Sequence, residues 1–410
     1  MASNGNLKPY TIIRLDIRKK GAPQFLAKRI EEGLRAGMGT FKIKVPEDGK
    51  SAYPSMCVPI AGVIDYYRRI HNCEFIPSSS LRKNSYLSHT SFLSAREYAS
   101  NASRSYLDVV WRFTAEDQFE IVSGIVDAIR SKIVVESGVL ESVELCLNEV
   151  TDNVLVHSAP SNTDDPPSGF VMAQCHAGES TIAIAVYDNG QGIYRSFRGS
   201  DYSPATPVEA IELALTRNVT SGDGQGRGMW MLSSIVECGK GSIEVNSGGA
   251  RFLHEHTGKY KKAPVVSKVS SEIDGTTLVD FRLSAENKID IASALGGYTP
   301  TNLWLENRED DKTDHIVLCV KKDSDGTGTR FAGKKFRTII ENAMNQSNRK
   351  VVLDFADIEV VSSSYADELL GILVQKYGFV AFANKVSLVG LTGLNAMIID
   401  ESIKTRFASS

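Results

Sequence analysis

The chain of 410 residues is 42% hydrophobic and 23% charged, and it carries a formal net charge of -3 at pH 7. These values are typical of an ordinary globular protein and exclude disordered and collagen-like chains. Nucleic acid is not an expected partner, because the local positive charge at 17–20 has no aromatic residues among its cations and reads as a solvated face. At roughly 150 residues per domain, the length predicts two or three domains, and we expect three.

Cysteine usage and hydropathy favour an intracellular chain. The six cysteines include no C-x-x-C pair and no nearby histidine at zinc-ligand spacing, so we expect neither a disulfide framework nor a zinc site. No apolar run approaches the roughly 18 residues that a membrane span needs. The first residues also lack the apolar core of a signal peptide. We therefore expect a cytoplasmic protein that makes no membrane contact.

Residues 1–115 alternate extended and helical patterns. Strands are expected at 41–45 and 56–60, and a helix with apolar residues at helical spacing is expected at 61–70. The stretch 78–105 is rich in Ser and Asn and predicts a long connection. The alternation predicts an N-terminal α/β domain.

Residues 116–285 read as one domain that combines helices with a sheet. Two long helices are expected at 117–133 and 138–157, and a further helix begins near Gly228. A short helix is expected at 207–215. The expected strands, each rich in β-branched and aromatic residues, are 170–176, 181–188, 242–246, 250–256 and 276–283.

A polar linker is expected at 286–302, followed by a third domain at 303–410. In this domain strands alternate with helices, which implies crossover connections and a sheet with helices packed against it. The expected strands and helices, in chain order, are 315–322, 330–344, 350–355, 364–377, 385–391 and 394–407. The predicted fold class for the whole chain is therefore α/β multidomain.

Polar residues and glycines recur in a fixed order through the central domain. Glu149 and Asn153 lie one helical turn apart in NEVTDNVLVHS, so both face one side of a helix. The later stretches are D-N-G-Q-G from Asp188, G-Q-G-R-G ending at Gly228, and the strand start G-T-T at 275–277. Glycines let a backbone approach a ligand closely, and a helix that begins after such a loop directs its N–H groups at phosphates. Each motif alone is weak, and their order is what indicates nucleotide binding.

In this order the motifs resemble the GHKL superfamily, the ATP-binding domain shared by gyrase, heat-shock chaperone, histidine kinase and mismatch-repair ATPases. The resemblance covers about 117–285 and implies a two-layer α/β sandwich. The stretch NEVTDNVLVHS is most similar to that of gyrase-type ATPases and of the serine kinases that act as anti-sigma factors.

The resemblance implies ATP and Mg²⁺ as cofactors and a role for each matching residue. Glu149 would be the general base that deprotonates the attacking water or hydroxyl, and Asn153 would complete the coordination of a Mg²⁺ held by the ATP phosphates. Asp188 would accept a hydrogen bond from the adenine amino group. The other implied nucleotide contacts are glycines under the base, sugar and phosphates and one threonine near adenine: Gly190, Gly192, Gly224, Gly226, Gly228 and Thr276.

The span 193–223 would be the ATP lid. It is polar and rich in turns, and a lid must move for nucleotide to enter and leave. Its arginines, Arg195, Arg198 and Arg217, are candidate phosphate contacts. The sequence does not choose among them.

The third domain resembles the STAS fold of anti-sigma-factor antagonists over roughly 303–410. The stretch KVVLDFADIEVVSSSYADELLGIL carries a strand that ends in an acid and then a serine turn at a helix start, with Ser363 at the place of the phosphorylated serine. Ser362 stands where an aspartate is usual, and Tyr365 stands where a glycine is usual. A simple helix cap formed by these serines is the favoured interpretation. By analogy of fold, the N-terminal domain is either a diverged STAS-like unit or a sensory unit.

The resemblances leave the output of the ATP module open. One alternative is a signalling switch with serine kinase activity, in which phosphate passes to a Ser or Thr of a STAS-like domain or partner. Another is an ATPase clamp that dimerises on binding ATP and signals by conformation. A histidine kinase is least favoured, because neither His71 nor His89 fits an acceptor helix with an acid after the histidine. Either leading alternative implies a protein partner or a second copy of the chain.

Overall fold

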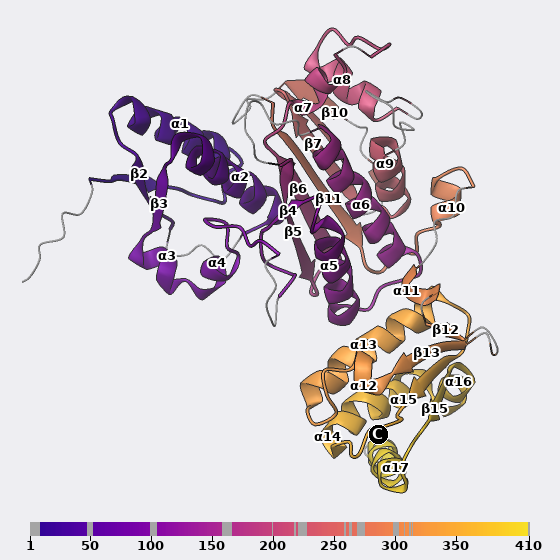
Figure 1. Cartoon of the computed structure of the whole chain (residues 1–410). Coiled ribbons are helices and arrows are strands. Elements are labelled where there is room, and N and C mark those ends of the chain that lie inside the picture. Colours follow the sequence, from indigo (N-terminus) through magenta and orange to yellow (C-terminus); the bar gives the residue numbers. More distant parts are fainter. Residues whose placement is uncertain are drawn as a thin grey trace, which may run out of the picture. The chain divides into compact units, whose positions relative to one another are not determined.

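The computed structural model describes residues 9–46, 52–98, 105–157, 166–198, 200–216, 219, 228–257, 260–261, 265–268, 275–297, 303–306, 308–310, 313 and 315–408 (Figure 1). The chain divides into two compact units. The first unit consists of Met1–Ile125 and Val143–Ser284, and the second of Val126–Ser142 and Ala285–Ser410. Helices and several sheets build both units, so the predicted α/β multidomain class is confirmed.

The N-terminal part of the first unit is a parallel sheet with crossover helices. Its three strands are β1 (Thr11–Arg14), β2 (Thr40–Lys44) and β3 (Glu74–Pro77), in that order. The crossover helices are α1 (Ala22–Arg35) and α2 (Pro54–His71). Two short helices, α3 (Ser79–Lys83) and α4 (Ser85–His89), follow β3.

The strand expected at 56–60 is wrong, because these residues form the first turns of α2. Met56, Cys57, Val58 and Ile60 are all buried. A helix segment that is buried on all sides has a continuous apolar run, which periodicity cannot distinguish from a buried strand. Pro54 stands in the first turn, where a missing N–H costs nothing.

The central part of the first unit is a large antiparallel sheet in the order β10-β8-β7-β11-β6-β5-β4. A short strand, β9 (Tyr260–Lys261), pairs with β8 at its side. The strands on the main path are β4 (Trp111–Thr114), β5 (Ser168–His176), β6 (Thr181–Asp188), β7 (Ser242–Ser247), β8 (Ala250–Thr257), β10 (Val265–Lys268) and β11 (Thr277–Ser284).

Helices cover both faces of this sheet (Figure 1). On one face lie α6 (Val139–His157) and α9 (Gly228–Cys238), and α5 (Gln118–Lys132) precedes α6 in the chain. On the other face α2 packs across β5 and β6, and Gly62 of α2 lies directly against the ring of Tyr187. The N-terminal sheet and this face of the central sheet therefore share one hydrophobic core, to which Met172, Ala185 and Tyr187 belong.

The second unit holds a four-stranded sheet in the order β12-β13-β14-β15, parallel except for β12. Its strands are β12 (Glu309–Asp310), β13 (His315–Cys319), β14 (Val351–Asp354) and β15 (Val386–Val389). Its helices are α10 (Ile291–Ala294), α11 (Leu303–Glu306), α12 (Val320–Asp323), α13 (Arg330–Gln346), α14 (Ser363–Ala366), α15 (Ile372–Tyr377), α16 (Phe379–Lys385) and α17 (Gly393–Ala408). A π-helical turn, Asp367–Gly371, joins α14 to α15.

Asn342 of α13 anchors the segment Val126–Ser142, which comprises the end of α5, the connection and the start of α6, within the second unit. Its side chain is fully buried, and its Nδ2 donates to the carbonyls of Arg130 at 2.7 Å and Ile133 at 3.0 Å. Its Oδ1 accepts from the amide of Val135 at 2.8 Å. One amide side chain thus satisfies three backbone groups that would otherwise be buried without partners.

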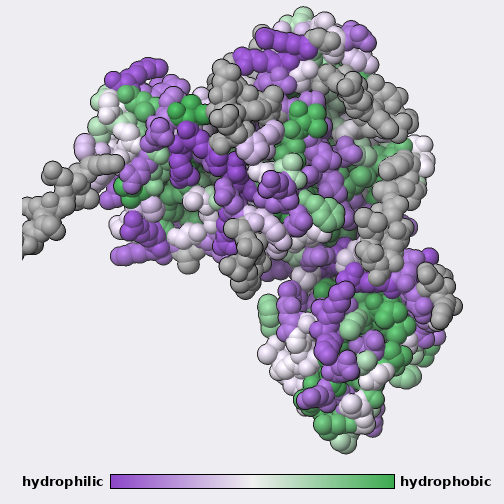
Figure 2. All heavy atoms as spheres, viewed as in Figure 1, coloured by the Kyte–Doolittle hydropathy of each residue, from purple (hydrophilic) through white to green (hydrophobic). Residues whose placement is uncertain are grey.

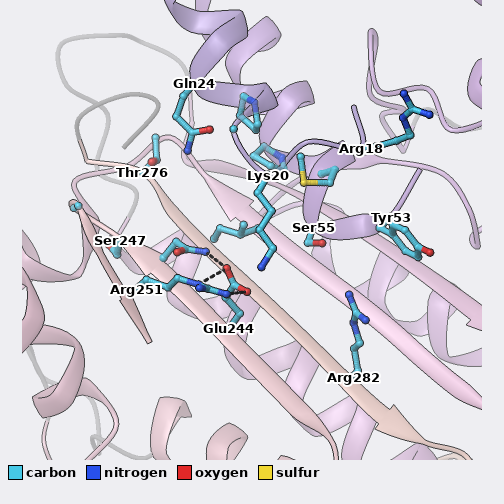
Figure 3. A pocket seen from close by; sticks show the side chains of 18 residues that line it. Arg18, Lys20, Gln24, Tyr53, Ser55, Glu244, Ser247, Arg251, Thr276 and Arg282 are labelled. Carbon is cyan, nitrogen blue, oxygen red and sulfur yellow. Dashed lines mark hydrogen bonds and ion pairs between the residues drawn. The ribbon is translucent and has the colours of Figure 1, made fainter. Parts of the chain in front are cut away.

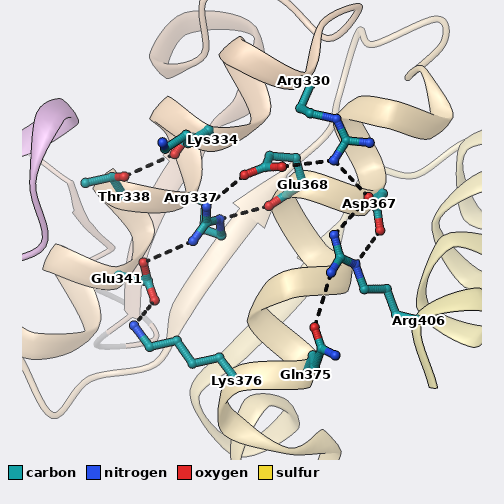
Figure 4. A network of polar contacts seen from close by, with 10 residues as sticks. All are labelled: Arg330, Lys334, Arg337, Thr338, Glu341, Asp367, Glu368, Gln375, Lys376 and Arg406. Atoms are coloured by element: carbon teal, nitrogen blue, oxygen red, sulfur yellow. Dashed lines mark hydrogen bonds and ion pairs between the residues drawn. The ribbon is translucent and has the colours of Figure 1, made fainter. Parts of the chain in front are cut away.

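A chain of ion pairs links the helices of the second unit (Figure 4). Arg337 of α13 donates to the Glu368 carboxylate at 2.8 Å and to the Glu368 carbonyl at 2.9 Å. Its guanidinium also lies 3.7 Å from Glu341, which is 1% exposed and pairs with Lys376 at 2.6 Å. Arg330 and Arg406 continue the network through Asp367. These pairs fix α13 against the helical run that starts at Ser363.

Hydrophilic and hydrophobic side chains are mixed over the face shown in Figure 2. The exposed large apolar residues include Phe379, Val380 and Met397 of the second unit. Among the described residues, no helix is both long enough and apolar enough to cross a membrane.

Candidate functional site

Glu149 and Asn153 project from one side of α6 toward the first residue of α9. Gly228 lies so close that a Cβ there would be 2.7 Å from Glu149 Oε2 and 3.1 Å from Asn153 Nδ2. A side chain at this position would make the ends of both polar side chains shift, so the glycine leaves room for them where α9 starts. Three residues that the sequence predicts from two motifs come together, whereas Gly224 and Gly226 lie outside the described residues.

The Glu149 carboxyl has the properties of a proton acceptor. Its side chain is partly buried, and this burial, with a smaller contribution from the charge of Asp152, raises its pKa above the ordinary value. A higher pKa makes a carboxylate a better general base near neutral pH. Asp152 points elsewhere and accepts a hydrogen bond from Gln118 Nε2 at 2.6 Å.

Asp188 ends β6 as a buried acid. Its Oδ1 accepts the amide N–H of Gly190 at 2.7 Å, and its carboxylate also accepts from the Thr277 hydroxyl. Burial nevertheless dominates and raises the pKa of Asp188 to about 7. The carboxylate is thus held at the start of the D-N-G-Q-G loop by its own backbone and by the neighbouring strand.

Thr277 is the threonine that meets Asp188, and the sequence reasoning missed it in favour of Thr276. Thr277 and Asp188 are cross-strand partners in the pairing of β11 with β6. Thr276, one residue earlier, lines a cavity together with Leu278. The alternation of the strand explains this difference, because Thr277, Val279 and Phe281 share one face. That alternation is visible in TTLVDFRL and is the signal that could have identified Thr277.

The glycine loop after Asp188 packs against Ser247 and Gly275. Gly192 has a φ of +75° and Gly275 a φ of +89°, a region that favours glycine. A Cβ on Gly275 would be 2.5 Å from the carbonyl oxygen of Gly190. Ser247 Oγ accepts the amide N–H of Ile193 at 2.9 Å and lies 3.1 Å from Thr277 Oγ1. Ser247 therefore ties the loop to β11.

One packing contact connects the α6 pair to the Asp188 loop. Val154, next to Asn153, packs on Gly169 of β5, where a Cβ would be 2.7 Å from Val154 Cγ1. Gly169 is the cross-strand partner of Asp188. The missing side chain at Gly169 thus lets α6 approach the strand end that carries the buried acid.

The expected lid contains α7 (Gly192–Ser196) and α8 (Pro207–Ala214). Arg195 belongs to α7 and is partly buried, and Arg198 is exposed just after it. Arg217 lies outside the described residues. The choice of phosphate ligand among these arginines stays a prediction.

In the second unit the serines at the start of α14 have different surroundings. Ser362 caps the helix, because its Oγ accepts the amide N–H of Tyr365 at 3.0 Å and lies 3.1 Å from Ser364 Oγ. Ser363 is exposed at the first helical position. The cap is therefore Ser362, and the hydroxyl at the place of the phosphorylated serine is accessible.

The residues around Glu149 fit a nucleotide with its own metal ion. Among the described residues, no group of three or more His, Cys, Asp or Glu side chains could hold a metal by itself. Mg²⁺ commonly takes one or two protein ligands together with substrate phosphates and water. The amide side chain of Asn153, beside a glycine that leaves room at the start of α9, could supply one such ligand.

Comparison with known proteins locates one family in the second unit. The family model of a STAS-like domain of unknown function (DUF4325) matches residues 332–394, which confirms the STAS-like prediction over these residues. No curated protein matches the chain.

Solved structures similar to the chain include two ATPase domains. The ATPase domain of Thermus thermophilus gyrase B, in complex with an aminocoumarin, is 15% identical over 48% of this chain and 46% of that one, with a TM-score of 0.22. The ATPase region of Saccharomyces cerevisiae topoisomerase II is 14% identical over 55% of this chain and 51% of that one, with a TM-score of 0.21. The chain thus spans about half the length of these structures, and such scores support no conclusion about ligand or activity.

Proposed function

We propose that the central domain binds Mg-ATP and transfers phosphate to a Ser or Thr of a STAS-like domain, in this chain or in a partner. The observation that carries the proposal is the meeting of Gly228 with Glu149 and Asn153, since two motifs that are far apart in the sequence supply one cluster. The resemblance of these motifs to the GHKL superfamily is the reason for proposing Mg-ATP as the ligand. The STAS-like match at 332–394 supplies the class of acceptor.

In this proposal the adenine end of the site is Asp188. Its carboxylate accepts a hydrogen bond from the adenine amino group. The Gly190 amide and the Thr277 hydroxyl donate to the carboxylate and hold it in position. Gly192 has a positive φ and no side chain, which lets the loop after Asp188 pack against Ser247 and Gly275. This pocket fixes the nucleotide and selects adenine, because a buried acceptor is costly to leave without a donor.

At the phosphate end Glu149 acts as general base and Asn153 as metal ligand. ATP supplies the phosphoryl group, and its Mg²⁺ neutralises charge on the phosphates. Glu149 takes the proton of the acceptor hydroxyl while that oxygen bonds to the γ-phosphorus, and ADP leaves. The raised pKa of Glu149 suits this role. Ser363 is the proposed acceptor within the chain, because its hydroxyl is exposed whereas Ser362 is engaged as a cap.

The alternative function is an ATP-gated clamp that signals by conformation. The observation in its favour is a hydrogen bond from Asn189 Nδ2, in the glycine loop, to the carbonyl of Gly62 in α2 at 2.9 Å. A movement of this loop on nucleotide binding would therefore be transmitted through α2 to the N-terminal sheet. An output of this kind requires no phosphoprotein.

One experiment separates the two functions. The full chain is incubated with Mg²⁺ and γ-labelled ATP beside Glu149→Ala, and released phosphate and protein-bound label are followed together. Label on Ser or Thr that the variant lacks supports the kinase. Free phosphate without label, together with a dimer that forms in a non-hydrolysable ATP analogue on size exclusion, supports the clamp. Absence of both products at saturating ATP, with a STAS-like partner added, contradicts the proposal.

A further inference from the structure

A cavity lies in the first unit, on the face of the central sheet that α2 covers. Its volume is about 520 Å³, within the range of pockets that hold small molecules. The loop after β1, the start of α1 and the start of α2 form its wall, and residues of β7, β8 and β11 form its floor (Figure 3). Because Thr276 and Leu278 line it while Thr277 meets Asp188, the two sites lie on opposite faces of β11.

The charged side chains that line this cavity are mainly basic: Arg18, Lys20, Arg251, Arg282 and one acid, Glu244. Arg251 and Glu244 form a bidentate pair at 2.8 and 2.6 Å. Two further acids stand close by, Asp16 beside Arg18 at 2.8 Å and Asp280 beside Arg282 at 3.8 Å. The cations thus exceed the carboxylates by one (four against three).

Lys20 supplies that excess charge. Among the described residues it has no salt-bridge partner. Burial raises the pKa of Glu244, but hydrogen bonds from Arg251 and Asn246 outweigh it and lower this pKa, and the charge of Lys20 adds a small contribution. Figure 3 shows its ammonium group directed toward Glu244. Lys20 belongs to the basic stretch 17–20, which the sequence suggested was only a solvated face. Lys20 is exposed, in agreement with that interpretation, and it also lines the cavity.

Apolar groups complete the lining. Met56, Pro59 and Leu278 contribute aliphatic surface, and Tyr53 contributes a ring that lies 6.0 Å from the Arg282 guanidinium. A ligand here would place an apolar or aromatic body between α2 and the sheet and a charged group at Lys20 and Arg282. The site also follows the carboxyl end of a parallel strand, β1, where ligands of α/β sheets commonly bind.

We propose that this cavity binds a small organic anion with an aromatic or apolar body and that the ligand regulates the nucleotide site. The binding part stands on the cavity alone, and the regulatory part rests on the proposed function. Ser247 connects the two sites, because it lines the cavity while its hydroxyl, on the face of Thr277, accepts the amide N–H of Ile193 in the glycine loop. A ligand that shifts Ser247 or α2 therefore shifts the loop that follows Asp188.

The binding test uses 1-naphthyl phosphate and 1-naphthoate as anionic probes and 1-naphthol as the uncharged one, followed by calorimetry on the full chain. At least one anion is expected to bind tenfold more tightly than 1-naphthol. The double variant Lys20→Ala with Arg282→Ala is expected to lose at least tenfold in affinity for that anion. Arg35→Ala, an exposed cation of α1 with 79% exposure, is the matched control and should bind as the unchanged chain does.

The comparison of the two anions tells whether the cavity takes phosphate or carboxylate. If the tighter-binding anion still binds to Asp188→Asn and in the presence of saturating ADP, its binding site lies outside the nucleotide site. A change of at least threefold in the affinity for ADP when this probe is saturating supports regulation. If this probe binds but the chain binds no nucleotide, the cavity is supported as a binding site and the proposed function is overturned.

Three results would overturn the cavity proposal. Equal affinity for 1-naphthol and both anions would remove the role of charge. Unchanged affinity in the double variant, with a thermal melt like that of the unchanged chain, would remove the role of Lys20 and Arg282. Displacement of the probe by ADP together with loss of binding in Asp188→Asn would place it in the nucleotide site.

Discussion

Gly228 at the start of α9 lies against Glu149 of α6, where a Cβ would come within 2.7 Å of the carboxylate. Gly228→Ala should therefore displace the proposed base and its neighbour Asn153. We expect ATP turnover or protein labelling to fall by about tenfold to a hundredfold, because displacements of this size misalign reacting groups. The free energy of unfolding should change by less than about 1 kcal/mol, since alanine favours a helix over glycine. Steady-state kinetics and a denaturant titration measure both quantities.

Gly393→Ala is the matched control for this variant. Gly393 is likewise the first residue of a helix, α17, and a Cβ there would meet no atom within 4 Å. Its activity should equal that of the unchanged chain. Equal activity in Gly228→Ala as well would show that the α6 pair does not take part in the reaction.

The two adjacent threonines should differ in their effect on nucleotide affinity. Thr277→Val removes the hydroxyl that donates to Asp188, and we expect ATP to bind about tenfold more weakly because hydrogen bonds to charged groups contribute about 1.5–3 kcal/mol. Thr276→Val alters the cavity face and should change the affinity by less than threefold. Calorimetry with a non-hydrolysable ATP analogue measures both. The reverse ranking would assign the nucleotide to Thr276, as the sequence reasoning had it.

Asp188 should make stability depend on pH. Its pKa is raised from 3.8 to about 7, so between these values the folded chain binds more protons than the unfolded chain. The contribution of Asp188 to the free energy of unfolding therefore falls as the pH rises through this window and is lost above about pH 7. Asp188→Asn should show a flatter profile in urea titrations between pH 5 and pH 8. Parallel profiles for the two proteins would contradict the raised pKa.

Nucleotide affinity should follow the opposite trend with pH. Only the ionised Asp188 accepts the adenine amino group at full strength, so ATP should bind more tightly as the pH rises toward 8. Fluorescence titration with a labelled ATP analogue checks this. In Asp188→Asn we expect weak binding and the loss of that pH dependence, whereas a persistent dependence would point to another group.

The serines of α14 should separate stability from phosphorylation. Ser362→Ala removes the helix cap and should lower the free energy of unfolding by about 0.5–2 kcal/mol while label is still incorporated. Ser363→Ala should leave stability within about 0.5 kcal/mol and abolish label within the chain. Thermal melts and mass spectrometry of the labelled protein measure the two effects. Undiminished label in Ser363→Ala would move the acceptor to another residue or to a partner.

Arg337 should be a major contributor to the stability of the second unit. Arg337→Met leaves the carboxylate of Glu368 without its closest partner, and breaking a buried pair costs about 3–5 kcal/mol. Lys321→Met, whose pair with Asp357 is exposed, should cost less than about 1 kcal/mol. Urea titrations of both variants compare the two losses. Similar small losses would show that the buried network contributes little.

The sequence by itself determined the elements whose pattern is local and strong. The helices expected at 117–133 and 138–157 are α5 and α6, because each repeats apolar residues over several helical turns. It also predicted that Glu149 and Asn153 share a face, since i, i+4 spacing fixes this in any helix. The end of the strand at Asp188 and the start of the helix at Gly228 could also be predicted from the sequence, because glycines mark both positions.

Only the tertiary structure decided how these elements meet. It made 56–60 a helix, turned Thr277 rather than Thr276 to Asp188, and brought Lys20 to a cavity floored by β7 and β11. It also tied the segment Val126–Ser142 to α13 through Asn342, more than 200 residues away in the chain. Local periodicity carries no information about such partners, because burial and hydrogen bonding are satisfied by whichever distant residues the fold brings together.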